Sequence, residues 1–165
     1  MANMSQMASM SQMDAMTFLN MPRNIQNLIE QKLRRAEDLR SLARSSTVNL
    51  QKVFTKGGKV DERLQDMVTE ALSMEEEAQD LMLIKIDAER EVLEVIHRLH
   101  HIKMEEIFRM RYLEECSWES ISRSTLTDIR WIHRQHKRGL GLIQRILDTM
   151  EGEVGQCLQE AQKLG

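Results

Sequence analysis

Twelve positions between Val60 and Leu99 follow one another at alternating spacings of four and three residues. They are Val60, Leu64, Met67, Ala71, Met74, Ala78, Leu81, Lys85, Ala88, Val92, Val95 and Leu99, with Lys85 as the single polar member. A sustained average period of 3.5 residues holds a stripe on one side of a long helix when that helix packs against another helix. This stripe, here called the seam, predicts a long helix with a helical partner.

A shorter segment, Arg23 to Arg44, also carries apolar residues at helical spacing, with Pro22 at its first turn. The TKGGKV segment between the two predicted helices is typical of a turn. Folded back as an antiparallel hairpin, the shorter helix covers about half of the longer one at roughly 1.5 Å per residue. The rest of the 60–99 seam then needs either the C-terminal region or a second copy of the chain, and homo-oligomerisation through this seam stays open.

The composition favours helices throughout, because the 165 residues include one proline and seven glycines. No apolar run approaches the roughly 18 residues of a membrane helix. The N-terminus lacks the pattern of a secretory signal, and two cysteines are too few for a disulfide framework. We therefore expect a cytoplasmic protein with no membrane partner.

The predicted fold class is all-α, with a long N-terminal antiparallel helical hairpin or coiled coil followed by a C-terminal helix-turn-helix domain. The expected divisions are a disordered Met-rich leader at 1–21, the hairpin at 22–100, the helix-turn-helix at 101–147 and a tail at 148–165. In the leader, methionine recurs every third residue in a Ser/Gln/Ala background. That period drifts around a helix, so it predicts no packed face.

Charge is strongly segregated along the chain. Residues 60–96 contain 3 Lys or Arg against 12 Asp or Glu, whereas residues 97–147 contain 10 against 6 and all five histidines. A phosphate backbone is repelled by the first block and attracted by the second. Nucleic acid is therefore expected at 97–147.

Three helices are predicted within 101–147. The first includes Met104 to Leu113 and ends around Glu115, the second is Trp118–Arg123 with Ser117 as its N-cap, and the third runs from Asp128 or Thr127 to about Leu147. Ser124 to Thr127 form the turn between the last two. The predicted core consists of Tyr112, Leu113, Trp118, Ile121, Ile132 and Leu140. A helix, a tight turn and a basic helix are the parts of a helix-turn-helix.

The first two turns of such a recognition helix meet base edges in the major groove of double-stranded DNA. The residues that fall there on one face are Ile129, Arg130, His133 and Arg134. Arg130 and Arg134 have the geometry to pair with guanine, and Ile129 can touch a thymine methyl group. Further along the helix, Lys137, Arg138 and Arg145 suit phosphates.

Other chemistry is not expected. His97, His100 and His101 stand at i, i+3 and i+4, a spacing compatible with a metal site, but no acidic or thiol ligand accompanies them at matching spacing. We interpret them as solvated imidazoles near a helix end. No nucleophile with a placed base and no phosphate loop occurs. The chain is expected to have no catalytic residues, no cofactor and no metal.

The stretches RYLEECSWESIS and DIRWIHRQHKRGL resemble the second half of region 4 of bacterial primary-type sigma factors. The arrangement of a helical hairpin and this module is similar to small phage and prophage transcriptional regulators of Gram-positive bacteria, over about Met13 to Leu147. The resemblance implies that base contacts fall on Ile129, Arg130, His133 and Arg134. This sequence departs from the family pattern at Leu126, where the turn usually has glycine, and at Gln135, where an aliphatic residue is usual.

The resemblance implies a sequence-specific DNA-binding regulator in the cytoplasm of a bacterial host, with the recognition helix at about 128–145. Two alternatives stay open. One is a DNA-packaging adaptor similar to the small subunit of a phage terminase. The other is a module that binds host RNA polymerase without binding DNA.

Overall fold

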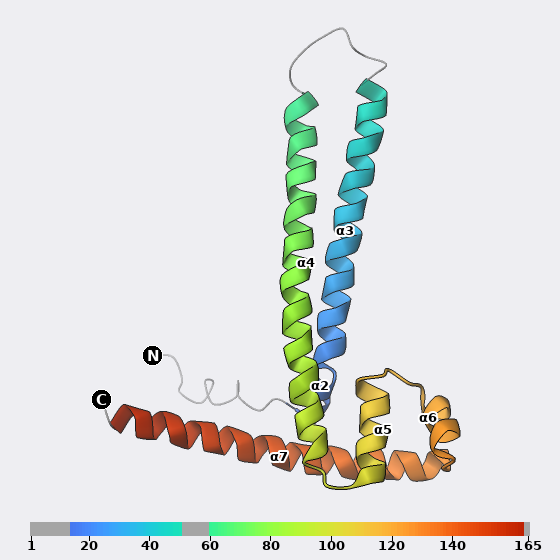
Figure 1. Ribbon diagram of the computed structural model, residues 1–165, viewed down its shortest axis with the longest axis vertical. Coiled ribbons are helices and arrows are strands. Elements are labelled where there is room, and N and C mark those ends of the chain that lie inside the picture. The colour runs from blue at the N-terminus through green and yellow to red at the C-terminus, as the bar shows by residue number, and fades with distance from the viewer. Residues whose placement is uncertain (1–13, 51–59, 164–165) are drawn as a thin grey trace, which may run out of the picture. The chain divides into compact units, whose positions relative to one another are not determined.

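The computed structural model describes residues 14–50 and 60–163. The elements are α2 (Ala15–Leu19), α3 (Met21–Leu50), α4 (Val60–His97), α5 (Ile102–Tyr112), α6 (Trp118–Thr125) and α7 (Ile129–Lys163) (Figure 1). No strand occurs among the described residues, so the predicted all-α class is confirmed. None of the described helices is both long enough and apolar enough to cross a membrane.

The chain divides into two compact units. The two-helix unit comprises residues 22–87, which are α3 and the larger part of α4. The C-terminal unit comprises α2, the end of α4 from Ala88, and α5, α6 and α7. The division falls within α4, so a single helix belongs to both units.

In the two-helix unit, α3 and α4 lie side by side (Figure 1). Ala36 and Leu39 of α3 are buried against Ala71 of α4, with Met67 and Met74 packed around them. Small alanines at the centre of this contact let the two helices approach closely. The two helices run antiparallel, as the colours along α3 and α4 show in Figure 1.

The seam of α4 faces inward along the described part of its length. Ala71, Ala78, Ala88, Val92, Val95 and Leu99 are buried, and Leu64, Met67, Met74, Leu81 and Lys85 are half-buried. Its first part packs on α3, and its last part joins the core of the C-terminal unit. Met67, Ala71 and Met74 of the seam therefore pack on α3, and Val92, Val95 and Leu99 belong to the core of the C-terminal unit.

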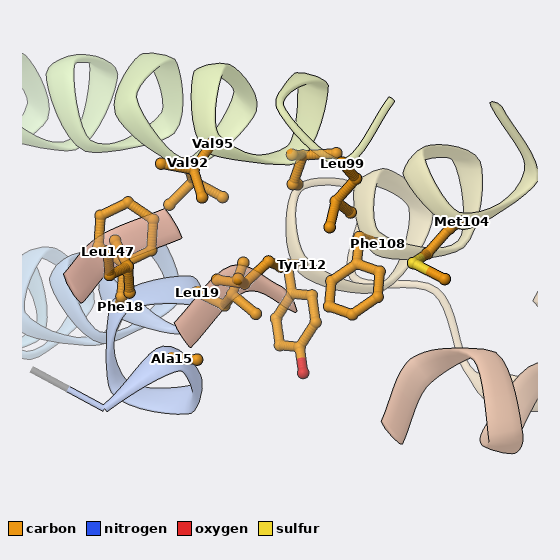
Figure 2. Close-up of a cluster of buried hydrophobic side chains, with 12 residues drawn as sticks. Ala15, Phe18, Leu19, Val92, Val95, Leu99, Met104, Phe108, Tyr112 and Leu147 are labelled. Atoms are coloured by element: carbon orange, nitrogen blue, oxygen red, sulfur yellow. The ribbon is translucent and has the colours of Figure 1, made fainter. Parts of the chain in front are cut away.

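The main core of the C-terminal unit joins the end of α4 to α2, α5 and α7 (Figure 2). Its largest fully buried side chains include Leu19, Ile96, Met104, Phe108 and Ile143. These residues come from four different helices, so the burial of apolar surface at this point holds the unit together.

Helix α2 corrects the prediction of a disordered leader over 1–21. Phe18 and Leu19 are 7% and 0% exposed, and the Ala15 N–H donates to Oε1 of Gln144 at 2.8 Å. The period of three in the methionines did not predict this short apolar segment. The segment is helical because Phe18 and Leu19 pack in the core of the C-terminal unit. Residues 1–13 of the leader lie outside the described residues.

The last helix is longer than predicted. α7 does not end near Leu147 but continues to Lys163, through the segment expected as a tail. Leu147 is 8% exposed and Met150 packs on the same core, so apolar contacts carry the helix past the predicted end.

Candidate nucleic-acid interface

Hydrogen bonds fix the connection between α5 and α6. The Cys116 N–H donates to the carbonyl of Met110 at 2.8 Å, and the Arg111 guanidinium donates to the carbonyl of Cys116 at 3.0 Å. The Ser117 hydroxyl accepts from the Ser120 N–H at 3.2 Å, which confirms the predicted N-cap. Because α6 is only eight residues long, this cap and the preceding bonds set its direction.

The turn between α6 and α7 is equally constrained. Leu126 adopts the left-handed conformation, with φ 49° and ψ 41°, and its N–H donates to the carbonyl of Ser122. The Ser122 hydroxyl in turn donates to the Thr127 carbonyl at 2.6 Å. Asp128 caps α7, because its Oδ1 accepts from the N–H of Arg130 at 2.8 Å. These main-chain and side-chain hydrogen bonds thus hold the start of α7 in place after α6.

A second, smaller core lies beneath this turn. Ile107, Met110, Ile121 and Ile132 are buried together, with Cys116, Trp118 and Trp131 partly buried around them. Of the six predicted core residues, Tyr112, Ile121 and Ile132 are buried, and Leu113, Trp118 and Leu140 are half-buried. Buried apolar residues of α5, α6 and α7 therefore pack together and fix the relative positions of the three helices.

Helix α7 passes very close to α5 at Gly139. A Cβ atom added to Gly139 would clash with the Phe108 ring, lying 2.7 Å from its Cζ, and would lie 3.0 Å from the Met104 sulfur. This close approach of α7 to α5 was not predicted from the sequence. Gln135, one turn earlier, is half-buried, and no buried side-chain nitrogen or oxygen lacks a partner in the described residues. The departure at Gln135 therefore leaves no unsatisfied group.

An aromatic cluster that was not predicted lies beside this crossing. The His136 ring stacks on Phe108 and Tyr112 and meets Trp118 edge-on, at centroid distances of 5.1, 5.8 and 4.8 Å. The Tyr112 hydroxyl lies 2.7 Å from Nε2 of His136. The signal was present in the sequence, since His136 follows Ile132 by four residues and so falls on the buried face of the helix.

Burial lowers the pKa of His136 to about 4, and the nearby Arg111 and His133 side chains act in the same direction. Burial also raises the pKa of Tyr112 to about 12. At neutral pH the imidazole is therefore uncharged and the phenol protonated. In that state the pair carries no net charge. Which of the two groups donates depends on the imidazole tautomer, and the Tyr112 hydroxyl can also donate to the Met16 sulfur at 3.2 Å.

The opposite face of α7 carries the predicted DNA-contacting residues. Arg130, His133, Arg134, Lys137, Arg138 and Arg145 are exposed, and Ile129 is half-buried. Arg130, Arg134, Lys137, Arg138 and Arg145 share one face by helical spacing. Residues 129–147 contain these five cations and no carboxylate. The structure thus brings these five cations and His133 together on one exposed surface, here called the basic face. Ile129 is half-buried and lies about 100° around the helix from Arg130, so it does not share this surface.

The cations of the basic face make no ion pairs within the part of the chain that the structure describes. In the two-helix unit the pattern is different, because Lys32, Arg35 and Arg40 of α3 pair with Glu77, Glu70 and Glu75 of α4. An unpaired cluster of like charges destabilises a fold by repulsion unless a ligand neutralises it. The basic face is therefore the surface of this chain best suited to an anion.

His133 is the one member of this surface with an aromatic partner. Its ring lies 4.8 Å from that of Trp118, tilted by 53°. The Arg111 guanidinium lies over the same Trp118 ring, 4.5 Å from its centroid. Trp118 therefore supports His133 from α6 and limits the number of orientations that its imidazole adopts.

The three histidines near 100 do not share a helical face. α4 ends at His97, His100 has a φ of 50°, and His101 is the N-cap of α5, where its Nδ1 accepts from Met104 N–H at 3.3 Å. Nδ1 of His97 lies 3.2 Å from Glu105. Among the described residues no group of three or more potential ligands is placed to hold a metal ion.

Comparison with known proteins adds no relative to this description. No protein-family model matches the chain, and no curated protein or solved structure is significantly similar to it.

Proposed function

We propose that this chain is a sequence-specific double-stranded DNA-binding protein whose helix-turn-helix consists of α6, the turn at Leu126 and α7. In this proposal α3 and α4 form the helical hairpin that accompanies the module. The observation that carries the proposal is the basic face. Its five cations form no ion pair with the described residues, and they begin in the first turn of a helix whose start is fixed by two hydrogen-bonded connections. Such a surface suits a phosphate backbone.

The division of roles follows from position along α7. Arg130 and Arg134 lie in the first two turns, which enter the major groove in this class of motif, and we assign base recognition to them. Lys137, Arg138 and Arg145 lie further along and supply phosphate contacts, which add affinity without sequence preference. The resemblance to sigma region 4 supports regulation of transcription in a bacterial cytoplasm as the purpose of this binding.

The test is binding to fluorescently labelled duplexes, measured by anisotropy over a salt series, after selection of a preferred sequence from a random pool. Arg130→Ala/Arg134→Ala is expected to lose the preference for the selected sequence while keeping weak, salt-sensitive binding. Each bidentate arginine contact is worth roughly 1–3 kcal/mol of discrimination. The matched control is Arg34→Ala/Arg35→Ala, which removes the same charge from exposed positions on α3.

The proposal fails if the wild-type chain shows no salt-dependent binding to any duplex at moderate ionic strength. It also fails in its assignment of residues if the α3 control loses sequence preference as severely as the α7 variant. A variant that kept full preference would move base recognition away from Arg130 and Arg134.

A further inference from the structure

Helix α4 exposes a second apolar stripe outside the seam. Val68, Leu72, Met82, Leu83 and Ile86 are 43%, 48%, 43%, 65% and 57% exposed. All five belong to the two-helix unit and fall within an arc of about 100° around the helix, taking 3.6 residues per turn. Exposed apolar residues this numerous on one face indicate a binding surface, because single exposed residues are normal but grouped ones are not.

The stripe has the spacing of a coiled coil. Val68, Leu72, Glu75, Gln79, Met82 and Ile86 follow one another at intervals of 4, 3, 4, 3 and 4 residues. The two polar members stand at its centre, and the apolar members stand at its ends. A stripe with this period fits a straight helical partner over five turns.

The stripe is also symmetric about Glu77. Val68 and Ile86 each lie nine residues from Glu77, and Leu72 and Met82 each lie five residues from it. The two central polar residues, Glu75 and Gln79, each lie two residues from it. When two copies of α4 run antiparallel, each residue on one copy faces the residue at the same distance on the other side of the centre. Val68 then meets Ile86 of the second copy, and Leu72 meets its Met82.

The central layer of the antiparallel pair is polar. Both oxygens of the Glu75 carboxylate are held by the Arg40 guanidinium of the same chain, at 2.7 and 2.8 Å. In the antiparallel arrangement this ion pair faces the uncharged Gln79 amide of the second copy, which can donate a further hydrogen bond to it.

We propose that the chain forms a two-fold homodimer in which the exposed stripes of two α4 helices pack antiparallel, centred on Glu77. The partner that covers the stripe is a second copy of the chain, because the stripe is complementary to itself. An isologous interface requires such self-complementarity. This interface differs from the seam, whose members Met67, Ala71 and Met74 pack on α3 of the same chain. The proposal does not depend on DNA binding.

The experiment measures the molar mass of the full chain by sedimentation equilibrium over a concentration series, with no DNA present. The wild type is expected to approach about twice the chain mass of 19.3 kDa. Ile86→Glu is expected to weaken dimerisation by at least about tenfold, because a carboxylate replaces an apolar contact at the interface. Ile84→Glu is the matched control, since Ile84 is 53% exposed on the same helix but lies off the stripe.

A pair of charges tests the antiparallel register. Leu72→Glu alone is expected to give a monomer, and Leu72→Glu/Met82→Lys is expected to recover the dimer, because Glu at 72 then faces Lys at 82 of the second copy. A parallel dimer would place Glu against Glu and would not recover. Wild type at one chain mass throughout, or a control as disruptive as Ile86→Glu, would overturn the proposal.

Discussion

Replacing Leu126 by glycine is expected to stabilise the C-terminal unit. Leu126 holds φ 49° and ψ 41° and its side chain is 94% exposed, so it contributes backbone strain and almost no burial. A left-handed conformation costs a residue with a Cβ roughly 1–2 kcal/mol. Glycine has no such cost, and the hydrogen bond from the position 126 N–H to Ser122 is kept because it belongs to the main chain.

The stabilisation expected from Leu126→Gly is partly offset by an effect on the unfolded state. Glycine gives the unfolded chain more conformational freedom, which costs about 0.4–1 kcal/mol. The net expectation is a stabilisation of roughly 0.5–1 kcal/mol. Leu126→Ala is the control, because it removes the exposed side chain but keeps the Cβ and therefore the strain.

The assay is urea unfolding followed by tryptophan fluorescence. The two tryptophans, Trp118 and Trp131, both lie in the C-terminal unit, so the signal reports on that unit alone. The unfolding midpoint should rise for Leu126→Gly and stay near the wild-type value for Leu126→Ala. If the glycine variant were no more stable than the alanine variant, the reasoning from backbone strain would be refuted.

Three further predictions concern the same unit. Gly139→Ala should destabilise it by roughly 1–3 kcal/mol through a clash with Phe108, whereas Gly141→Ala, with no atom within 4 Å of the new Cβ, should stabilise the helix by up to about 1 kcal/mol in the same unfolding assay. Because the pKa of His136 falls from 6.5 to about 4 on folding, the unfolded chain takes up the proton first. The contribution of His136 to the free energy of unfolding is therefore complete above pH 6.5 and decreases by roughly 1–2 kcal/mol as the pH falls to 4, after allowance for solvent screening. His136→Phe should flatten this pH dependence, which urea titrations at several pH values would measure. Lys137→Ala should weaken binding to all duplexes alike and reduce the slope of log affinity against log salt by about 1.

The long helices were predictable because their signal is periodic and extends over many turns. The seam and the apolar face of the shorter helix each repeat often enough to outweigh local exceptions such as Lys85. Helix α2 was not predictable in the same way, because its five residues make little more than one helical turn and cannot show a repeated pattern. Its apolar residues pack on parts of the chain more than 70 positions away, and the local sequence carries no record of them.

At the candidate site the exposed residues were easier to predict than the buried ones. A run of cations at helical spacing needs no partner to be recognised, and it lies on one face of α7 as expected. His136 and Gly139 depend instead on Phe108 of another helix, so their roles become visible only when α5 and α7 cross. The same argument explains Leu126, whose backbone conformation is set by the closing of the turn rather than by its own preference.

The two proposals make a joint prediction that neither makes alone. A single helix-turn-helix module buries a small interface, and linking two modules raises affinity for DNA that carries two sites through effective concentration. Ile86→Glu should therefore weaken binding to a duplex with two selected sites and leave binding to one site unchanged. Arg130→Ala/Arg134→Ala should weaken specific binding to both duplexes. If Ile86→Glu changed single-site and two-site binding equally, dimerisation would have no part in DNA recognition, while the assignment of the arginines would stand.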